Sequence, residues 1–152
     1  MELVKPSSEE EFPYWLSNFI DIYQKLATDN LESLHDIYSP EVIFQDPMHS
    51  ISGFDNLSAY FHELYTNVKS CQFVVDDVIY QDETAAIYWT MTYQHPKLNK
   101  GKEVIVHGHS KLKGKNDLVY YHRDYLDLGA MLYEHIPLLG RVVKHIKQRV
   151  NA

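Results

Sequence analysis

The chain of 152 residues is long enough for one domain and too short for two of ordinary size. Hydrophobic residues make up 45% and charged residues 23%, which argues against a disordered chain and against a fibrous repeat. The formal net charge of −7 argues against nucleic acid as a partner, because phosphate binding needs a concentrated basic surface.

Cysteine content and the N-terminal residues indicate the compartment. The single cysteine, Cys71, cannot form a disulfide within the chain, and no cysteine and histidine spacing resembles a zinc site. The first eleven residues carry four glutamates and lack the apolar run of a secretory signal. No apolar stretch approaches the ~20 residues of a membrane span. We therefore expect a cytoplasmic protein.

The N-terminal region predicts a long amphipathic helix. Ser7 or Ser8, followed by glutamates, is typical of a helix start, since acidic groups favour the positive end of the helix dipole. Apolar residues then recur with helical spacing over residues 12–27. Tyr23 lies within this apolar face.

Shorter elements follow, and prolines mark their ends. Pro40 ends a second helix that Asp29 or Asn30 can cap, and Pro47, directly after Asp46, breaks the strand that comes next. We expect a helix at residues 30–38, a strand at 41–45, a loop at 49–53 and a third helix at 54–68.

The second half of the chain changes to the alternation of strands. We expect strands at residues 72–81, 84–94, 103–113 and 118–127. Joined by three short turns, they form an antiparallel meander. Trp89 and Met91 share one face of the second of these strands, where they suit a cavity lining and a packed core equally well.

The C-terminal region differs in charge from the rest. Gly129 starts a short helical tail, and residues 136–150 form an amphipathic pattern in which cationic and apolar residues separate. Residues 135–152 contain no acidic residue and four basic ones. Such a helix can lie on an anionic membrane or a partner surface. We favour packing on its own domain or on a dimer mate over membrane contact.

The last predicted strand carries an unusual number of titratable groups. Alternation places Tyr120, His122, Asp124 and Leu126 on one face. Burying polar groups costs free energy unless they find partners. These side chains are therefore either exposed or lining a cavity that something polar or reactive occupies.

Three helices and a short strand followed by a meander predict an α+β domain with helices on one face of a curved sheet. The order of these elements, with Phe44-Gln45-Asp46-Pro47, Gly53 and the closing residues 122–127, resembles the nuclear transport factor 2-like superfamily. Within it, the chain is most similar to the branch of SnoaL-like polyketide cyclases and ketosteroid isomerases. The resemblance extends over residues 12–127.

This resemblance implies a cone, in which a curved, mostly antiparallel (mixed) sheet wraps around the N-terminal helices. It also implies a deep apolar pocket and a homodimer formed through the sheet. We expect the cone at residues 1–135 and an additional C-terminal helix at 136–152. The superfamily holds isomerases, cyclases, epoxide hydrolases and dehydratases as well as non-catalytic binding domains, so the fold alone does not supply a function.

The resemblance also implies two candidate bases. Asp46-Pro47 is similar to the pair that provides the base of ketosteroid isomerases, and Asp124 in His122-Arg123-Asp124 is similar to the base of SnoaL-like cyclases. The tyrosine and protonated acid of the isomerase oxyanion hole have no clear counterpart, although Tyr23 and His107 lie on suitable elements.

The residues themselves support Asp124 first. The Cα atoms of Asp124 and His122 lie roughly 6.6 Å apart on one strand face, so the pair can share a substrate or a water molecule. A carboxylate in an apolar cavity is a stronger base, and imidazole titrates near neutral pH. The alternative is a buried ion pair that holds the sheet together. Asp46 and His49 also have structural explanations. Asp-Pro at a strand end is typical of an ordinary turn, and a lone histidine in a loop is usually just solvated.

We therefore expect a domain that binds a small apolar or aromatic metabolite, with cofactor-free proton transfer of the isomerase or cyclase type. The alternative is a binding or protein-interaction module without turnover. His107 and His109 share a strand face, but nothing in their spacing is diagnostic of a metal site, so we expect no metal. The expected catalytic residues are Asp124, His122 and Asp46, and the expected binding residues are Tyr23, His49, Tyr65, Trp89, Met91, His107 and Tyr120.

Overall fold

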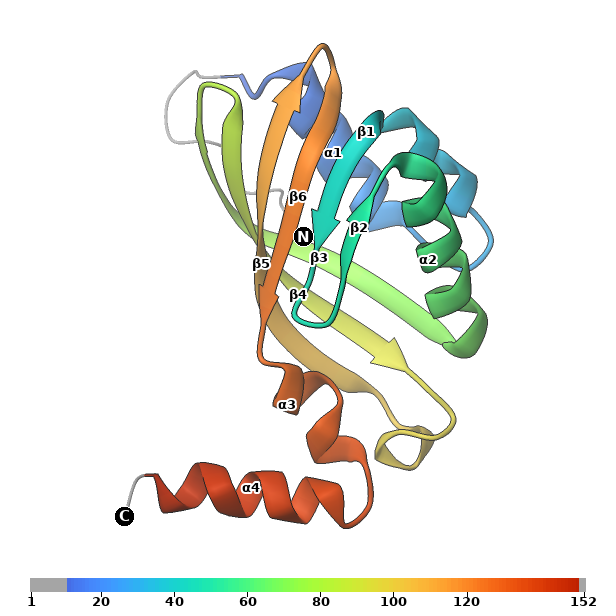
Figure 1. Ribbon diagram of the computed structural model, residues 1–152, viewed down its shortest axis with the longest axis vertical. Helices are drawn as coiled ribbons and strands as arrows, with labels where there is room; N and C mark the ends of the chain where they lie inside the picture. Colours follow the sequence, from blue (N-terminus) through green and yellow to red (C-terminus); the bar gives the residue numbers. More distant parts are fainter. Residues whose placement is uncertain (1–10, 151–152) are drawn as a thin grey trace.

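The computed structural model describes residues 11–150. A six-stranded sheet, in the order β2-β1-β6-β5-β4-β3, curves around helices α1 and α2 (Figure 1). The strands are β1 Tyr38–Gln45, β2 Ser50–Ser52, β3 Ser70–Gln81, β4 Thr84–Gln94, β5 Val104–Lys115 and β6 Leu118–Leu126. The α-helices are α1 Tyr14–Lys25, α2 Phe54–Asn67, α3 Leu128–Met131 and α4 Leu139–Arg149; short 3-10 helices span Leu31–Asp36, Asn99–Gly101 and Tyr133–His135. The predicted α+β class and curved mixed sheet are confirmed.

Helix α1 provides much of the core inside the cone. It buries Trp15, Leu16, Phe19, Ile20 and Tyr23, which is the apolar face that the sequence predicts. These side chains pack against the inner face of the sheet, where Leu112 and Val119 are fully buried. The helix start predicted at Ser7 or Ser8 lies outside the described residues.

The predicted loop at residues 49–53 is wrong in part, because β2 occupies Ser50–Ser52 and pairs antiparallel with β1. The Asp46 carboxylate accepts hydrogen bonds from the backbone of the next residues, which reverses the chain and sets Phe44 opposite Ile51. Two neighbouring boundaries also differ: β1 already begins at Tyr38, and the predicted second helix is the 3-10 helix Leu31–Asp36.

The sheet is mixed because β1 pairs parallel with β6. Strands β3 to β6 pair antiparallel in succession, which confirms the predicted meander. The parallel pairing places the end of β1 beside the end of β6, so two segments far apart in sequence meet at one end of the cone (Figure 1).

A β-bulge interrupts the pairing of β5 with β6. Gly114 pairs with Val119, but Lys113 pairs with Tyr121, so one additional residue of β6 lies between the two pairs. Val119 and His122 both point inward and are buried, whereas Tyr120 lines a groove on the outer face of the sheet. The prediction that Tyr120 shares a face with His122 is therefore wrong, since simple alternation does not hold across a bulge.

Helix α4 extends from the open end of the cone (Figure 1). Its contacts are chiefly with the short helix Tyr133–His135, and Lys147 forms ion pairs with Asp127 at 2.6 Å and Glu134 at 3.2 Å. Five apolar residues of this segment are exposed, from Leu139 at 41% to Val150 at 80%; the others are Leu138, Val142 and Ile146. No helix within residues 11–150 is long and apolar enough to cross a membrane.

Candidate active site

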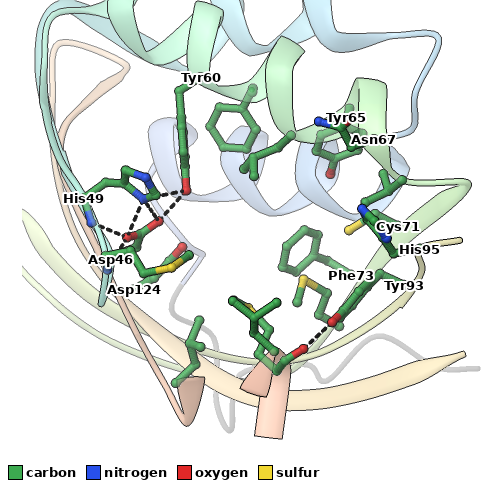
Figure 2. A pocket seen from close by; sticks show the side chains of 18 of the residues that line it. Asp46, His49, Tyr60, Tyr65, Asn67, Cys71, Phe73, Tyr93, His95 and Asp124 are labelled. Atoms are coloured by element: carbon green, nitrogen blue, oxygen red, sulfur yellow. Dashed lines mark hydrogen bonds and ion pairs between the residues drawn. The ribbon is translucent and has the colours of Figure 1, made fainter. Parts of the chain in front are cut away.

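A cavity of about 430 Å³ opens inside the cone between the helices and the inner face of the sheet (Figure 2). Its walls are mostly aromatic and aliphatic. Phe61, Phe73, Trp89, Met91 and Leu126 belong to this apolar lining. Polar side chains gather at two places: Asp46, His49, Tyr60 and Asp124 on one side, and Tyr65 and Cys71 on the opposite side. An apolar cavity with a few convergent polar groups is the usual form of a small-molecule site.

The parallel pairing of β1 with β6 explains why two carboxylates reach the same side. Phe44 lies opposite His122, and both side chains are buried inside the cone. Two positions further along each strand come Asp46 and Asp124, which therefore face the same side of the sheet. Both line the cavity.

Asp124 is held by two hydrogen bonds on one of its two carboxylate oxygens. His122 Nε2 lies 2.6 Å from Asp124 Oδ1, and the Ser110 hydroxyl donates to the same oxygen at 2.5 Å. Among the described residues no hydrogen bond reaches Oδ2. The side chain is 19% exposed, so this second oxygen is presented to the cavity.

The direction of the Ser110 hydrogen bond follows from its other neighbour. The indole nitrogen of Trp89 lies 2.9 Å from Ser110 Oγ and can only donate. The Ser110 oxygen therefore accepts from Trp89 and gives its own proton to Asp124. The buried indole thus fixes the orientation of the hydroxyl, and the hydroxyl fixes the carboxylate.

Behind Asp124, His122 connects to two buried tyrosines. Its Nδ1 lies 2.6 Å from the Tyr38 hydroxyl, which is hydrogen bonded to the Tyr23 hydroxyl. Burial raises the pKa of both phenols well above 10, so they carry protons at neutral pH. With Tyr38 as donor, a neutral imidazole accepts at Nδ1 and donates from Nε2 to Asp124. His122 is 1% exposed and therefore orients Asp124 from behind the cavity wall.

Asp46 is engaged on both of its oxygens. Its Oδ1 accepts from the backbone nitrogens of Met48 and His49 at 2.7 Å each, and Oδ2 accepts from the Tyr60 hydroxyl at 2.5 Å. The His49 imidazole adds a contact to Oδ1 at 3.2 Å (Figure 2). Burial and the bond to Asp46 raise the pKa of Tyr60 above its usual value, so Tyr60 remains a donor. These bonds shape the turn into β2.

The structure brings most of the predicted site residues together. Seven of the ten line the cavity: Tyr23, Asp46, His49, Tyr65, Trp89, Met91 and Asp124. His122 lies directly behind the wall. Their roles in binding or chemistry remain predictions.

Two predicted binding residues face away from the cavity. Tyr120 is turned to the outer groove by the bulge in β6. His107 lies on the outer face of β5, next to the exposed Ile105, and its Nδ1 lies 3.1 Å from the Thr90 hydroxyl. The prediction that His107 binds the ligand is therefore wrong, because its inward neighbours on the strand are the buried Val106 and Gly108. No group of three metal-ligating side chains occurs within the part of the chain that the structure describes.

Sequence reasoning missed Ser110, Tyr38 and Tyr60. Ser110 lies on the same face of β5 as the buried Val106 and Leu112, and a hydroxyl at such a position signals a buried partner. Tyr38 lay in a predicted helix, and Tyr60 on the apolar side of another, so neither stood out. Their partners come from distant parts of the chain, which no local pattern indicates.

Comparison with known proteins agrees with this architecture. The sequence model of the family described as SnoaL-like domain matches residues 19–122. A search of the curated proteins found no match.

Similar solved structures include a candidate SnoaL-like polyketide cyclase from Jannaschia sp. CCS1, with 13% identity, a TM-score of 0.72, and coverage of 86% of this chain and 99% of that protein. A protein of ketosteroid isomerase-like fold from Catenulispora acidiphila, in complex with trimethylamine, has 11% identity, a TM-score of 0.71, and coverage of 84% and 96%. An epoxide hydrolase of the LEH-like type from M. tuberculosis has 11% identity, a TM-score of 0.63, and coverage of 77% and 83%. At these identities the likeness shows the fold alone.

Proposed function

The chain belongs to the SnoaL-like domain family, and from that premise we propose that it binds a small apolar or aromatic carbonyl compound and moves a proton on it without a cofactor. Asp124 is the base. The observation that carries this proposal is the free Oδ2 of Asp124, presented to an apolar cavity while Oδ1 is held by Ser110 and His122. A fixed carboxylate with one unoccupied oxygen meets the geometric requirement for a general base.

The proposed step begins with a C–H bond next to a carbonyl group. Asp124 Oδ2 takes the proton, the C–H electron pair moves into the conjugated system, and negative charge develops on the carbonyl oxygen. The same carboxylic acid then returns the proton to the same carbon or to another carbon of the conjugated system, which gives exchange or isomerisation. Atoms and electrons balance without any further reactant.

The surrounding residues support this step in distinct ways. His122 and Ser110 hold the carboxylate in one rotamer, so little reorganisation is needed when the proton arrives. The aromatic walls around Trp89 and Phe73 exclude water, which strengthens the electrostatic interactions of a carboxylate. His122 is a positioning residue, because it lies behind Asp124 and not in the cavity lining.

The direct test is deuterium uptake. The full chain is incubated in D₂O with 1-tetralone or 4-acetylbiphenyl, and loss of the α-proton signal is followed by NMR. We expect uptake above the buffer rate that Asp124→Asn abolishes, while Asp46→Asn retains it. Ketones that bind without any catalysed exchange would favour a binding module without turnover.

A second candidate function is self-association, which helix α4 favours. All 21 acidic residues and ten of the 14 basic residues lie in residues 1–134, a net charge of −11. In contrast, α4 presents exposed Val142 and Ile146 among cations. We infer that α4 docks on the outer sheet face of a second copy. That face exposes Ile79, Tyr88, Ile105 and Tyr125. This is the predicted homodimer through the sheet, with α4 as an additional contact.

Light scattering of the full chain tests this association. We expect the wild type to be a dimer, and the double variant Val142→Glu/Ile146→Glu to dissociate at a tenfold higher protein concentration than the wild type. A control, Lys144→Gln, changes a cation and leaves the apolar residues in place. A wild-type monomer at 100 μM, or salt-sensitive binding of α4 to anionic vesicles, would contradict the inference.

A further inference from the structure

One buried hydroxyl of the cavity wall has no hydrogen-bond partner of ordinary strength among residues 11–150. Among the described residues, three buried side-chain polar atoms lack a hydrogen bond: Ser39 Oγ, Arg123 Nε and the Tyr65 hydroxyl oxygen. Of these three residues only Tyr65 lines the cavity. Tyr65 is 6% exposed, and a buried hydroxyl without a partner costs free energy. Such a group is expected where a ligand supplies the missing partner.

The environment of Tyr65 offers no strong acceptor. The neighbouring polar group is the Cys71 thiol, which forms a weak side-chain contact with the Tyr65 hydroxyl. Burial raises the pKa of this thiol to about 11, so it remains neutral at physiological pH. A thiol sulfur is a weak acceptor. Burial also raises the pKa of Tyr65, which therefore keeps its proton and remains a donor.

Other polar groups on this side of the cavity are exposed or already engaged. Asn67 is exposed, and its amide nitrogen donates to the carbonyl oxygen of Glu63 at 3.1 Å. The Tyr93 hydroxyl donates to the carbonyl oxygen of Met131 (Figure 2). The Nδ1 of His95 accepts from the backbone nitrogen of Lys97 at 3.0 Å. The Tyr65 hydroxyl is thus the buried donor that remains available. It lies across the cavity from Asp124, with Phe73 among the apolar side chains between them (Figure 2).

We propose that the Tyr65 hydroxyl is a second binding subsite, which donates a hydrogen bond to an acceptor oxygen at the far end of the ligand. The ligand is then a two-ended molecule: a carbonyl compound with an acidic C–H bond at Asp124, an apolar body against the aromatic walls, and a carbonyl or ether oxygen at Tyr65. The identity of the Asp124 end rests on the proposed function. The Tyr65 end rests on the unpartnered hydroxyl alone.

A first test needs no ligand. Replacing an unpartnered buried hydroxyl removes a desolvation cost, so Tyr65→Phe is expected to unfold at the same or a higher urea concentration than the wild type. Tyr93→Phe is the matched control, since it removes a hydroxyl of the same cavity that has an internal acceptor, and its midpoint is expected to fall. A midpoint that falls as much in Tyr65→Phe as in Tyr93→Phe would show an internal partner and overturn the proposal.

A second test uses pairs of ketones that differ only at the far end. Binding of 6-methoxy-1-tetralone is compared with 6-ethyl-1-tetralone, and of 4-acetyl-4′-methoxybiphenyl with 4-acetyl-4′-ethylbiphenyl, by quenching of Trp89 fluorescence. We expect the ether of at least one pair to bind about fivefold more tightly than its ethyl analogue, and Tyr65→Phe to abolish that preference. Tyr93→Phe is expected to retain it.

Equal binding of ether and ethyl compounds at both lengths would overturn the subsite, as would the absence of any binding by the wild type. The result is separable from the proposed function, because binding preference reports on Tyr65 and deuterium uptake reports on Asp124. An ether preference without uptake supports the subsite and contradicts the chemistry. Uptake without an ether preference supports the chemistry and contradicts the subsite.

Discussion

Asp46 and Asp124 occupy equivalent places on neighbouring parallel strands, yet their surroundings differ. Asp46 accepts hydrogen bonds on both oxygens, from two backbone nitrogens and the Tyr60 hydroxyl. Within residues 11–150, Asp124 accepts on one oxygen only, and the other faces the cavity. The first carboxylate is occupied in forming a turn, and the second has an oxygen available for the proposed reaction.

This difference shows what distinguishes a structural from a reactive carboxylate in the same cavity. Both side chains are partly buried, at 10% exposure for Asp46 and 19% for Asp124, so burial does not separate them. What separates the two carboxylates is the number of oxygens that have a hydrogen-bond partner. A fully satisfied carboxylate must break bonds before it can take a proton, whereas a half-satisfied one need not.

The largest effect is expected for Asp124→Asn, which removes the base and retains the shape. The rate of deuterium uptake should fall at least about 100-fold, in line with the usual contribution of a general base. The amide oxygen can still accept from Ser110 and His122, so the free energy of unfolding in urea should change by less than about 1 kcal/mol. Uptake that stays within tenfold of the wild type would remove Asp124 from the chemistry.

The converse is expected for Asp46→Asn. The amide cannot accept both from the backbone of the turn and from the Tyr60 hydroxyl, so a buried donor loses its partner. We expect the free energy of unfolding to fall by about 1–3 kcal/mol. Uptake by the folded fraction should remain within a few-fold of the wild type. A loss of uptake larger than that of Asp124→Asn would reverse the assignment of the two residues.

Ser110→Ala tests whether the hydrogen bond from Ser110 to Oδ1 of Asp124 is needed to position the carboxylate. The variant leaves Trp89 without an acceptor and Asp124 with His122 as its remaining donor. Because one hydrogen bond contributes about 1 kcal/mol, uptake should fall about fivefold. Ser39→Ala is the matched control, since this buried hydroxyl has no partner among residues 11–150 and should change neither uptake nor stability. Equal effects of the two substitutions would argue against the positioning role.

The smallest effect concerns a third carboxylate, Asp127, which lies in solvent. The hydrogen bond from Lys147 lowers the pKa of Asp127 below its usual 3.8, and the ion pair raises the pKa of Lys147. The stabilising contribution is therefore present above pH 3.8 and is lost as the pH falls through the lowered value. We expect the helical circular dichroism of the wild type to exceed that of Lys147→Gln at pH 5 and this difference to shrink as the pH falls below 3.8. A difference that does not shrink with falling pH would exclude Asp127 as its source.

Much of the fold could be predicted from the sequence because its signals are local. Helical spacing in α1 and α2 and alternation in β3 to β6 depend on neighbouring residues, and the predicted helices and strands are present, although alternation fails across the bulge in β6. The cavity lining followed from them, since Trp89 and Met91 face the same side of β4. The pairing of β1 with β6 joins distant segments, and no local pattern in the sequence indicates it.

The errors at the site come chiefly from one additional residue. Without the bulge, counting from the turn after Lys115 would pair Ser110 with Arg123, and the serine would remain unconnected to the site. With the bulge, Ser110 pairs with Asp124 and Tyr120 turns outward. A bulge leaves no clear mark in composition, so neither the outward direction of Tyr120 nor the pairing of Ser110 with Asp124 could be predicted by alternation.

The parallel pairing of β1 with β6 also bears on when the proposed site forms during folding. The two strands lie 78 positions apart where Arg123 contacts Gln45, whereas each hairpin of the meander joins residues close in sequence. Contacts between distant residues form late, because closing a long loop costs more entropy than closing a short one. A nascent chain that still holds β6 inside the ribosome can form helices and hairpins but lacks Asp124 beside Asp46. The proposed site is therefore complete only when the last strand of the cone is in place.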